Sequence, residues 1–142
     1  GYNHVLVHES GEMYSVEVSA RHFALLYGGD KGFILHTNHY LDPKMQAIEY
    51  EPDELIGTRL RYFRALRLLQ RIPKHTIKTL QAIQRDHQNY PHSICNHLTF
   101  DMDPLDREKT INALIIDLTA RAMHVAWGNP CENNYHTYYL ET

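Results

Sequence analysis

The feature that most constrains the fold is a change in the period of apolar residues along the chain. Val5 and Val7, and then every second residue between 14 and 18, carry apolar side chains. Such alternation predicts two β-strands, and the polar residues 9–12 between them predict a hairpin turn. Beyond residue 51 the apolar residues recur at spacings of three and four, which is the period of an α-helix. The two periods occupy separate blocks, so we expect strands and helices in different layers.

Two more strands are expected before residue 40. Residues 23–27 and Phe33-Ile34-Leu35 are apolar runs, and Gly28-Gly29-Asp30-Lys31-Gly32 between them is a turn signal. The first forty residues therefore predict a four-stranded meander.

Two amphipathic helices are expected in the middle of the chain. The first should begin near Glu51-Pro52-Asp53-Glu54, run for about five turns and end at Pro73. Its expected inner face is formed by Ile56, Leu60, Phe63, Leu66 and Leu69. The opposite face carries arginines and is expected to be solvated. Thr76 should cap the second helix, which places Ile77, Leu80 and Ile83 inward and ends at Asn89-Tyr90-Pro91.

The C-terminal third predicts three more strands. Apolar runs cover residues 111–118 and 122–127, residues 118–121 form the turn between them, and residues 136–140 form a short closing strand. The order of strands, helices and strands predicts an α+β fold. A length of 142 residues fits a single domain, 1–142.

Composition excludes several classes of protein. The formal net charge is −3, with acidic and basic residues interspersed, so nucleic acid is not an expected partner. No apolar run approaches the roughly 20 residues that span a bilayer, so no membrane partner is expected. Two cysteines make no disulfide framework; they fit a reducing cytoplasm, the expected compartment, or a periplasm equally well. No phosphate loop, nucleophile elbow, zinc-protease helix or dinucleotide fingerprint occurs, so no cofactor is expected.

The strongest catalytic candidate is Asn38, within Thr37-Asn38-His39-Tyr40. A carboxamide NH₂ can donate to an oxyanion without titrating, and Asn38 follows a predicted strand end. Its structural alternative is an Asn that closes an Asx turn. The neighbouring His39 is expected on the opposite face, as a substrate contact or a packing group.

Metal-ligand residue types also gather in the second half of the chain. They are Asp86, His87, His92, Cys95 and His97, with Cys131 and His136 as further candidates. We expect no metal site, because a strand through residues 92–97 would place His92 and Cys95 on different faces. Neither Cys95 nor Cys131 has a base or cation beside it in sequence, so neither is expected to be a nucleophile.

Several short strings occur in an order that resembles a known enzyme family. They are His8-Glu9-Ser10-Gly11, His36-Thr37-Asn38-His39-Tyr40-Leu41, Arg61-Tyr62-Phe63-Arg64-Ala65-Leu66, Arg85-Asp86-His87, Tyr90-Pro91-His92-Ser93-Ile94-Cys95 and Gly128-Asn129-Pro130-Cys131. The chain resembles the C-terminal portion of the isopenicillin N acyltransferase family of self-processing cysteine enzymes. The resemblance implies part of an αββα sandwich of the N-terminal nucleophile hydrolase type.

The resemblance also implies a reaction. In that family autoproteolysis frees an N-terminal cysteine that attacks an amide or thioester carbonyl. Gly1 would stand downstream of that cysteine, so the chain is expected to be a fragment, inactive alone, whose partner is the remainder of its own precursor. The expected substrate is a small acylated amine or acyl thioester. Self-association is a further expectation, because half a sandwich leaves apolar strand surface uncovered.

The resemblance assigns roles to particular residues. Asn38 corresponds to the oxyanion donor, and Cys95, Asn96 and His97 correspond to a substrate-lining segment, with His39 as a further substrate contact. The family often has arginine at the position of Asn96; a neutral amide lacks the fork that binds a carboxylate, so recognition of a β-lactam carboxylate is not carried over. The alternatives are a non-catalytic ligand-binding relative and, least favoured, a zinc-binding module.

Overall fold

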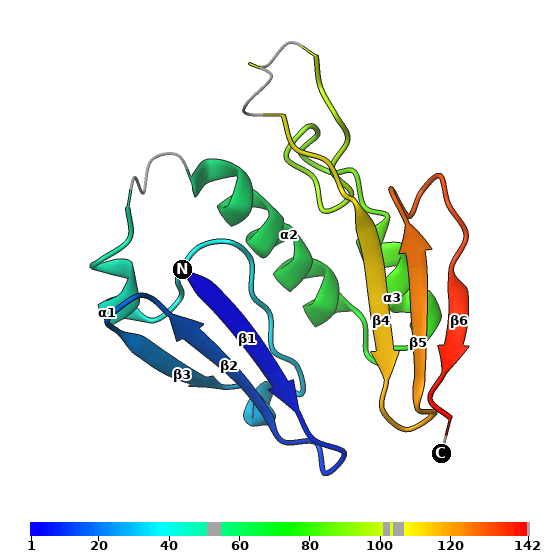
Figure 1. The fold of residues 1–142 in the computed structure, drawn as a ribbon, viewed down its shortest axis with the longest axis horizontal. Coiled ribbons are helices and arrows are strands. Elements are labelled where there is room, and N and C mark those ends of the chain that lie inside the picture. The colour runs from blue at the N-terminus through cyan, green and yellow to red at the C-terminus, as the bar shows by residue number, and fades with distance from the viewer. Residues whose placement is uncertain (51–54, 101–102, 104–106, 142) are drawn as a thin grey trace. The chain divides into compact units, whose positions relative to one another are not determined.

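The computed structural model describes residues 1–50, 55–100, 103 and 107–141, and it has the expected α+β class (Figure 1). It contains two separate three-stranded antiparallel sheets, with strand orders β1-β2-β3 and β4-β5-β6. The chain divides into two compact units, Gly1–Tyr62 and Phe63–Thr142, which we describe one at a time. The single domain expected over residues 1–142 stays a prediction.

The first unit is a small sheet covered on one face by a loop. Its elements are β1 (Tyr2–Val7), β2 (Met13–Val18), β3 (Phe23–Tyr27), the 3₁₀ helix η1 (Gly29–Lys31), α1 (Pro43–Gln46) and the start of α2 (Ile56–Arg71). The predicted hairpin is confirmed, with Val7 paired to Met13 and Tyr2 paired to Val18.

The predicted fourth strand at Phe33-Ile34-Leu35 is wrong, because residues 33–37 have no regular secondary structure. Gly32 adopts a left-handed φ of 70° at the end of η1, a conformation that glycine accepts without strain. The segment that follows is attached to the sheet by a side chain: His36 Nε2 lies 2.8 Å from Glu17 Oε1. A side-chain contact thus replaces the expected backbone ladder.

The sheet of the first unit covers its polar face and exposes its apolar one. Val18 pairs with Tyr2 and Phe23, so these three side chains share a face, and Tyr2 and Phe23 are each 77% exposed. On the other face Ser15 and Glu17 are both 0% exposed. An apolar sheet face open to solvent is typical of a surface that another element covers.

The first long helix, α2, spans Ile56–Arg71 and ends before Pro73, as predicted. The expected start at Glu51-Pro52-Asp53-Glu54 lies outside the described residues. The predicted inner face is wrong at its N-terminal end, since Ile56 is 64% exposed and Phe63 is 60% exposed.

The buried residues of α2 are instead Thr58 and Ala65. Two of the arginines expected to be solvated make specific contacts, Arg61 with Asn38 and Arg64 with Asp86. Polar residues in the loops therefore determine which face of α2 is buried. The spacing of apolar residues does not predict such contacts.

The second unit packs a short helix on the second sheet. Its elements after α2 are α3 (Ile77–Gln84), β4 (Asn112–Asp117), β5 (Ala122–Trp127) and β6 (His136–Tyr139), which confirm the predicted strands to within two residues. Thr76 caps α3 through a capping box with Thr79. Small and branched apolar residues of these elements are buried: Ile83, Ala113, Ile115, Ala122, Val125 and Ala126.

The predicted end of α3 at Asn89-Tyr90-Pro91 is wrong by five residues. The helix ends at Gln84, and the Asp86 carboxylate accepts from the backbone N–H of Gln88 at 3.1 Å and from Arg64 Nε at 2.9 Å. An Asp that bonds to the backbone two residues on favours a turn over a helix. Among the described helices, none is long and apolar enough to span a bilayer.

Candidate functional site

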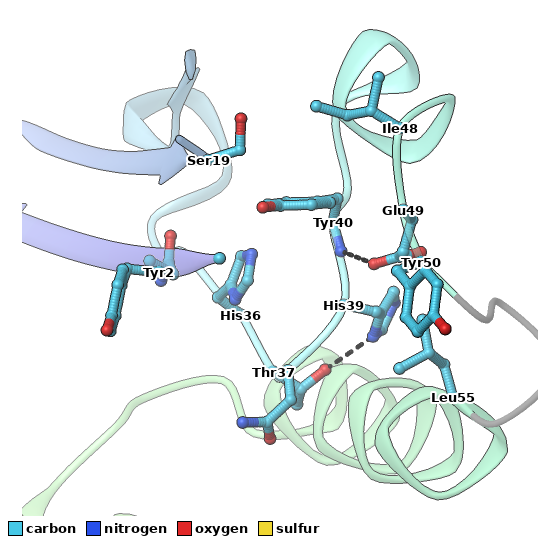
Figure 2. A pocket seen from close by; sticks show the side chains of 13 residues that line it. Tyr2, Ser19, His36, Thr37, His39, Tyr40, Ile48, Glu49, Tyr50 and Leu55 are labelled. Atoms are coloured by element: carbon cyan, nitrogen blue, oxygen red, sulfur yellow. Dashed lines mark hydrogen bonds between the residues drawn. The ribbon is translucent and has the colours of Figure 1, made fainter. Parts of the chain in front are cut away.

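The first unit contains a pocket of about 710 Å³ at the end of its sheet where β1 begins and β2 ends (Figure 2). Its walls come from the chain start, the loop that carries Asn38 and the segment after α1. The lining residues are Gly1, Tyr2, Asn3, Ser19, His36, Thr37, Asn38, His39, Tyr40, Ile48, Glu49, Tyr50 and Leu55. Most of these are aromatic or polar, as in sites that bind small polar ligands.

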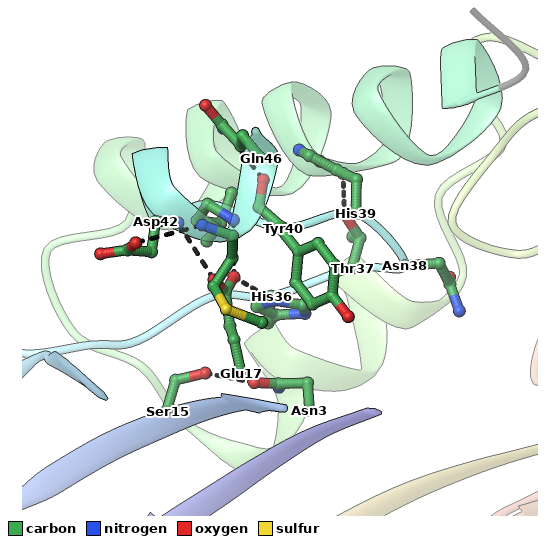
Figure 3. A network of polar contacts seen from close by, with 12 residues as sticks. Asn3, Ser15, Glu17, His36, Thr37, Asn38, His39, Tyr40, Asp42 and Gln46 are labelled. Atoms are coloured by element: carbon green, nitrogen blue, oxygen red, sulfur yellow. Dashed lines mark hydrogen bonds and ion pairs between the residues drawn. The ribbon is translucent and has the colours of Figure 1, made fainter. Parts of the chain in front are cut away.

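A fully buried carboxylate fixes the loop that carries these residues (Figure 3). Glu17 Oε1 lies 2.8 Å from His36 Nε2 and also accepts from the backbone N–H of Leu41, while Oε2 accepts from the N–H of Asp42 at 3.0 Å. A buried carboxylate is tolerated when its oxygens are satisfied in this way. Glu17 therefore determines the path of residues 36–42.

Asn38 is exposed, and both its backbone and its side chain are held by α2. Its N–H donates to Thr58 Oγ1 at 2.7 Å, and its Oδ1 accepts from Arg61 Nη2 at 3.1 Å. A guanidinium can only donate, so the amide oxygen must face Arg61 and the NH₂ must face away. Within the described part of the chain, no hydrogen bond is found for that NH₂. Figure 3 shows the side chain pointing away from Glu17 and His36.

His39 is buried, with an exposed fraction of 7%. Its Nδ1 lies 3.1 Å from Thr37 Oγ1 and 3.3 Å from Thr58 Oγ1, and its ring packs edge-on against Tyr62. Burial away from water lowers the pKa of His39 below its ordinary value of 6.5. The imidazole is therefore neutral at pH 7 and lines the pocket as a hydrogen-bonding wall.

Tyr40 closes another side of the pocket. Its backbone N–H donates to Glu49 Oε1 at 2.7 Å and its hydroxyl donates to Val18 O at 3.2 Å. Burial, with Glu17 and Glu49 nearby, raises the pKa of Tyr40 above 10, so the phenol stays protonated.

The segment Cys95-Asn96-His97 lies in the second unit. The predicted strand through residues 92–97 is wrong, since these residues form bends and irregular backbone. Cys95 is 0% exposed, and its N–H donates to Asp86 O at 3.0 Å. The backbone of Asn96 is held by Thr110 and by the side-chain amide of Asn129. The backbone at residues 95 and 96 is thereby fixed.

The two cysteines, which are far apart in sequence, meet in the structure. Cys95 Sγ and Cys131 Sγ are 3.5 Å apart, and both are free thiols. Loss of water around the thiol and the adjacent Cys95 raise the pKa of Cys131 to about 11, although the residue as a whole is exposed. A thiol with so high a pKa is a poor nucleophile at pH 7.

Of the metal-ligand residue types singled out in the sequence, four gather and the others do not. In the described residues His87, Cys95, His97 and Cys131 bring one ligand atom each within 4.8 Å of one another, whereas Asp86 pairs with Arg64. His92 and His136 are not members of the group.

Sequence reasoning assigned no role in the site to His36, which lines the pocket, or to three residues that hold the loop carrying Asn38, namely Glu17, Thr58 and Arg61. Glu17 gave no signal of its own, because it stands at a polar position of the alternating pattern of β2, between Val16 and Val18. The partner of that charge is 19 residues away, beyond the reach of local patterns.

The family model described as acyl-coenzyme A:6-aminopenicillanic acid acyl-transferase matches residues 1–132. No curated protein is similar enough to the chain to count as a match.

Proposed function

Because the chain belongs to the acyl-coenzyme A:6-aminopenicillanic acid acyltransferase family, we propose that it forms the substrate-side part of a cysteine-dependent amide hydrolase or acyltransferase. The reaction is acyl transfer from a small acylated amine or an acyl thioester. The nucleophilic cysteine belongs to another part of the same precursor, which autoproteolysis exposes, so these 142 residues alone are inactive.

The observation that carries this proposal is the orientation of Asn38. Arg61 and Thr58 hold the residue from α2, and the NH₂ faces away from Arg61 at the pocket. A donor fixed before the substrate arrives costs no reorganisation when negative charge develops on the carbonyl oxygen. Asn38 would thus stabilise the tetrahedral oxyanion.

Two other elements contribute to substrate binding in this proposal. Neutral His39 offers a ring nitrogen to a polar group of the substrate without adding charge. The segment Cys95-Asn96-His97 of the second unit is proposed to contact the acyl or amine group, and the backbone of Asn96 is held for this by Thr110 and Asn129. A neutral amide at 96 favours an uncharged substrate group over a carboxylate.

The test uses the longer precursor that supplies the N-terminal cysteine. Asn38→Ala should lower kcat on an amide or thioester substrate about 10²- to 10³-fold with little change in KM, as for loss of one oxyanion donor. Asn38→Asp keeps the shape but cannot donate, so it should lose at least as much. Asn134→Ala, an exposed asparagine of the second unit, is the matched control.

Turnover should be normalised to the processed fraction, measured by the mass of the new N-terminus. This separates a defect in self-cleavage from a defect in acyl transfer. Unchanged kcat per processed enzyme in Asn38→Ala would remove the assigned role of Asn38.

The remainder of the precursor is also the partner that fits the apolar face of β1, β2 and β3. Tyr2, Phe23 and Leu25 are exposed on that face. The chain alone should therefore self-associate, and Leu25→Lys should shift its sedimentation toward the monomer. A wild-type chain that sediments as a monomer at all concentrations would contradict this assignment.

A further inference from the structure

We propose that His87, Cys95, His97 and Cys131 bind a single Zn²⁺ ion in a structural site of the second unit. The inference is independent of the acyl-transfer proposal, since it concerns side chains that need no substrate. It reverses the expectation from sequence, which rested on a strand that does not form.

The distances between the ligand atoms fit one tetrahedral ion. With bonds of about 2.3 Å to sulfur and about 2.0 Å to nitrogen, the edges should be about 3.8 Å for S–S, about 3.5 Å for S–N and about 3.3 Å for N–N. The two sulfurs are 3.5 Å apart, and His97 Nε2 lies 3.7 Å from Cys95 Sγ, 3.2 Å from Cys131 Sγ and 3.0 Å from His87 Nε2. All four atoms lie within 4.8 Å of one another.

Hydrogen bonding alone accounts poorly for this convergence. Three groups that can donate, His87 Nε2 and the two thiols, face His97 Nε2. A neutral imidazole nitrogen has one lone pair, so it accepts one good hydrogen bond. A cation at the centre uses all four groups together, because each presents a lone pair to it once the thiols have lost their protons.

The surrounding residues orient the ligands as metal sites require. His97 Nδ1 lies 3.5 Å from Glu132 Oε1, which favours a proton on Nδ1 and leaves Nε2 for the ion. Asn129 Nδ2 lies 3.5 Å from Cys95 Sγ and can donate to a thiolate there. A carboxylate behind a histidine and a donor behind a thiolate are common partners of zinc ligands.

The chemistry of the set selects zinc among common divalent ions. Two thiolates and two neutral imidazoles cancel the charge of a divalent ion, and their softness disfavours Mg²⁺ and Ca²⁺. Binding releases the two thiol protons to solvent. Cys131 and His87 are exposed, which gives the ion a path to the site, while buried Cys95 closes its far side.

The site would join three segments of the second unit that are distant in sequence. His87 follows α3, Cys95 and His97 lie in the irregular segment before β4, and Cys131 follows β5 (Figure 1). An ion here would act as a cross-link in a unit with long irregular segments. Protein side chains would fill all four coordination positions of the ion, which is typical of structural and not of catalytic zinc.

The test is the metal content of the 142-residue chain purified under reducing conditions after exposure to zinc. Elemental analysis should find about one zinc per chain, and X-ray absorption should find two sulfur and two nitrogen neighbours. Substitution with Co²⁺ should give thiolate charge-transfer and tetrahedral d–d absorption bands.

Variants make the assignment specific. Cys131→Ser and His87→Ala should lose the stoichiometric metal, and Glu132→Gln should weaken zinc affinity about 10-fold while the chain stays folded. His136→Gln, a histidine outside the group, is the control and should keep the metal. Two results would overturn the site: a reduced, folded chain without zinc, or a Cys95–Cys131 disulfide that forms in place of metal binding.

Discussion

The two units of the chain bury different kinds of side chain. In the first unit the buried polar residues are Ser15, Glu17, His39 and Thr58, whereas the only buried apolar side chain found in its described part is Met45. In the second unit the buried set is mostly small and branched apolar residues. The first unit is therefore specified by hydrogen bonds to a few polar atoms, and the second by packing with additional polar anchors in its loops.

This difference suits the roles proposed for the two units. A loop shaped by a carboxylate can hold an amide donor such as Asn38 in one orientation without a large core. The second unit keeps its Cys and His residues in long irregular segments next to a packed sheet. If the hydrogen bonds of the first unit and the apolar packing of the second stabilise the two units independently, a substitution in one unit should leave the other unchanged.

The largest effect is expected for Glu17→Ala. The substitution removes the buried carboxylate that contacts the His36 ring and accepts from the N–H groups of Leu41 and Asp42. Breaking such a buried set should cost about 3 to 5 kcal/mol. Hydrogen exchange read by mass spectrometry should show lost protection in residues 36–46 and unchanged protection in β4 and β5.

Glu9→Ala, in the exposed hairpin turn, is the control and should change neither unit. Glu17→Gln sharpens the test, because one of its two oxygens becomes an NH₂ that cannot accept from a backbone N–H. Equal loss of protection in both units would show that the two modes of stabilisation are not separable.

A smaller effect is expected for Asp86→Asn in the second unit. Asp86 accepts both bonds from the Arg64 guanidinium, at 2.9 and 2.6 Å, and both side chains are largely shielded from water. Hydrogen bonds to charged groups contribute about 1.5 to 3 kcal/mol, so a loss of that order is expected in urea unfolding. Glu108→Gln, an exposed acid of the same unit, is the control.

The Arg64–Asp86 pair also predicts that the free energy of unfolding falls at acidic pH. The hydrogen bonds from Arg64 hold the pKa of Asp86 below its ordinary value of 3.8. As pH falls, Asp86 is therefore protonated in the unfolded chain before it is protonated in the folded chain. The contribution of the pair to the free energy of unfolding is complete above about pH 3.8 and is lost as pH falls toward the lower folded pKa. Asp86→Asn should flatten that loss, and a variant as acid-sensitive as wild type would contradict the assignment.

Thr76→Ala should have an effect of about 1 kcal/mol, the usual contribution of a helix N-cap. Thr76 Oγ1 accepts from the N–H of Thr79 at 3.2 Å, and Thr79 Oγ1 accepts from the N–H of Thr76 at 2.7 Å. The loss should be localised to α3 in hydrogen exchange. Thr119→Ala, in the exposed turn between β4 and β5, should leave α3 unchanged.

The cap at Thr76 also illustrates what could be predicted from the sequence. Capping, the end of α2 before Pro73 and the strands from β4 to β6 depend on neighbouring residues, so local patterns identified them. The family could be recognised for a related reason. Several short strings that occur in the same order identify it, even though each string alone is not specific.

Three of the errors have one physical origin. The segment after Gly32 reads as a strand, but its attachment is a side chain, His36 to Glu17. The inner face of α2 was misplaced because Arg61 and Arg64 have partners 22 or 23 residues away. Cys95 and Cys131 meet although they are 36 residues apart in sequence. Long-range polar contacts carry no local period, so patterns of apolar residues cannot report them.

The smallest expected effect is the pH response of the first unit through His39. Burial lowers the pKa of His39 below 6.5, and the nearby Arg59 and His36 lower it further while Glu49 and Glu17 oppose them. The unfolded chain thus binds the proton at a higher pH than the folded chain does. The free energy of unfolding should be constant above about pH 6.5 and should fall as pH drops below that value.

His39→Gln keeps a hydrogen-bonding group of similar length for Thr37 and Thr58 but cannot be protonated. The slope of unfolding free energy against pH, measured in urea, should therefore fall by up to about one proton relative to wild type. NMR of the His39 ring should give a folded pKa below 6.5. His22→Gln, an exposed histidine of the same unit, should leave the slope nearly unchanged. A ring that titrates above 6.5 would mean that the imidazolium is stabilised in the pocket, and His39 would then offer a cation, not a neutral wall, to the substrate.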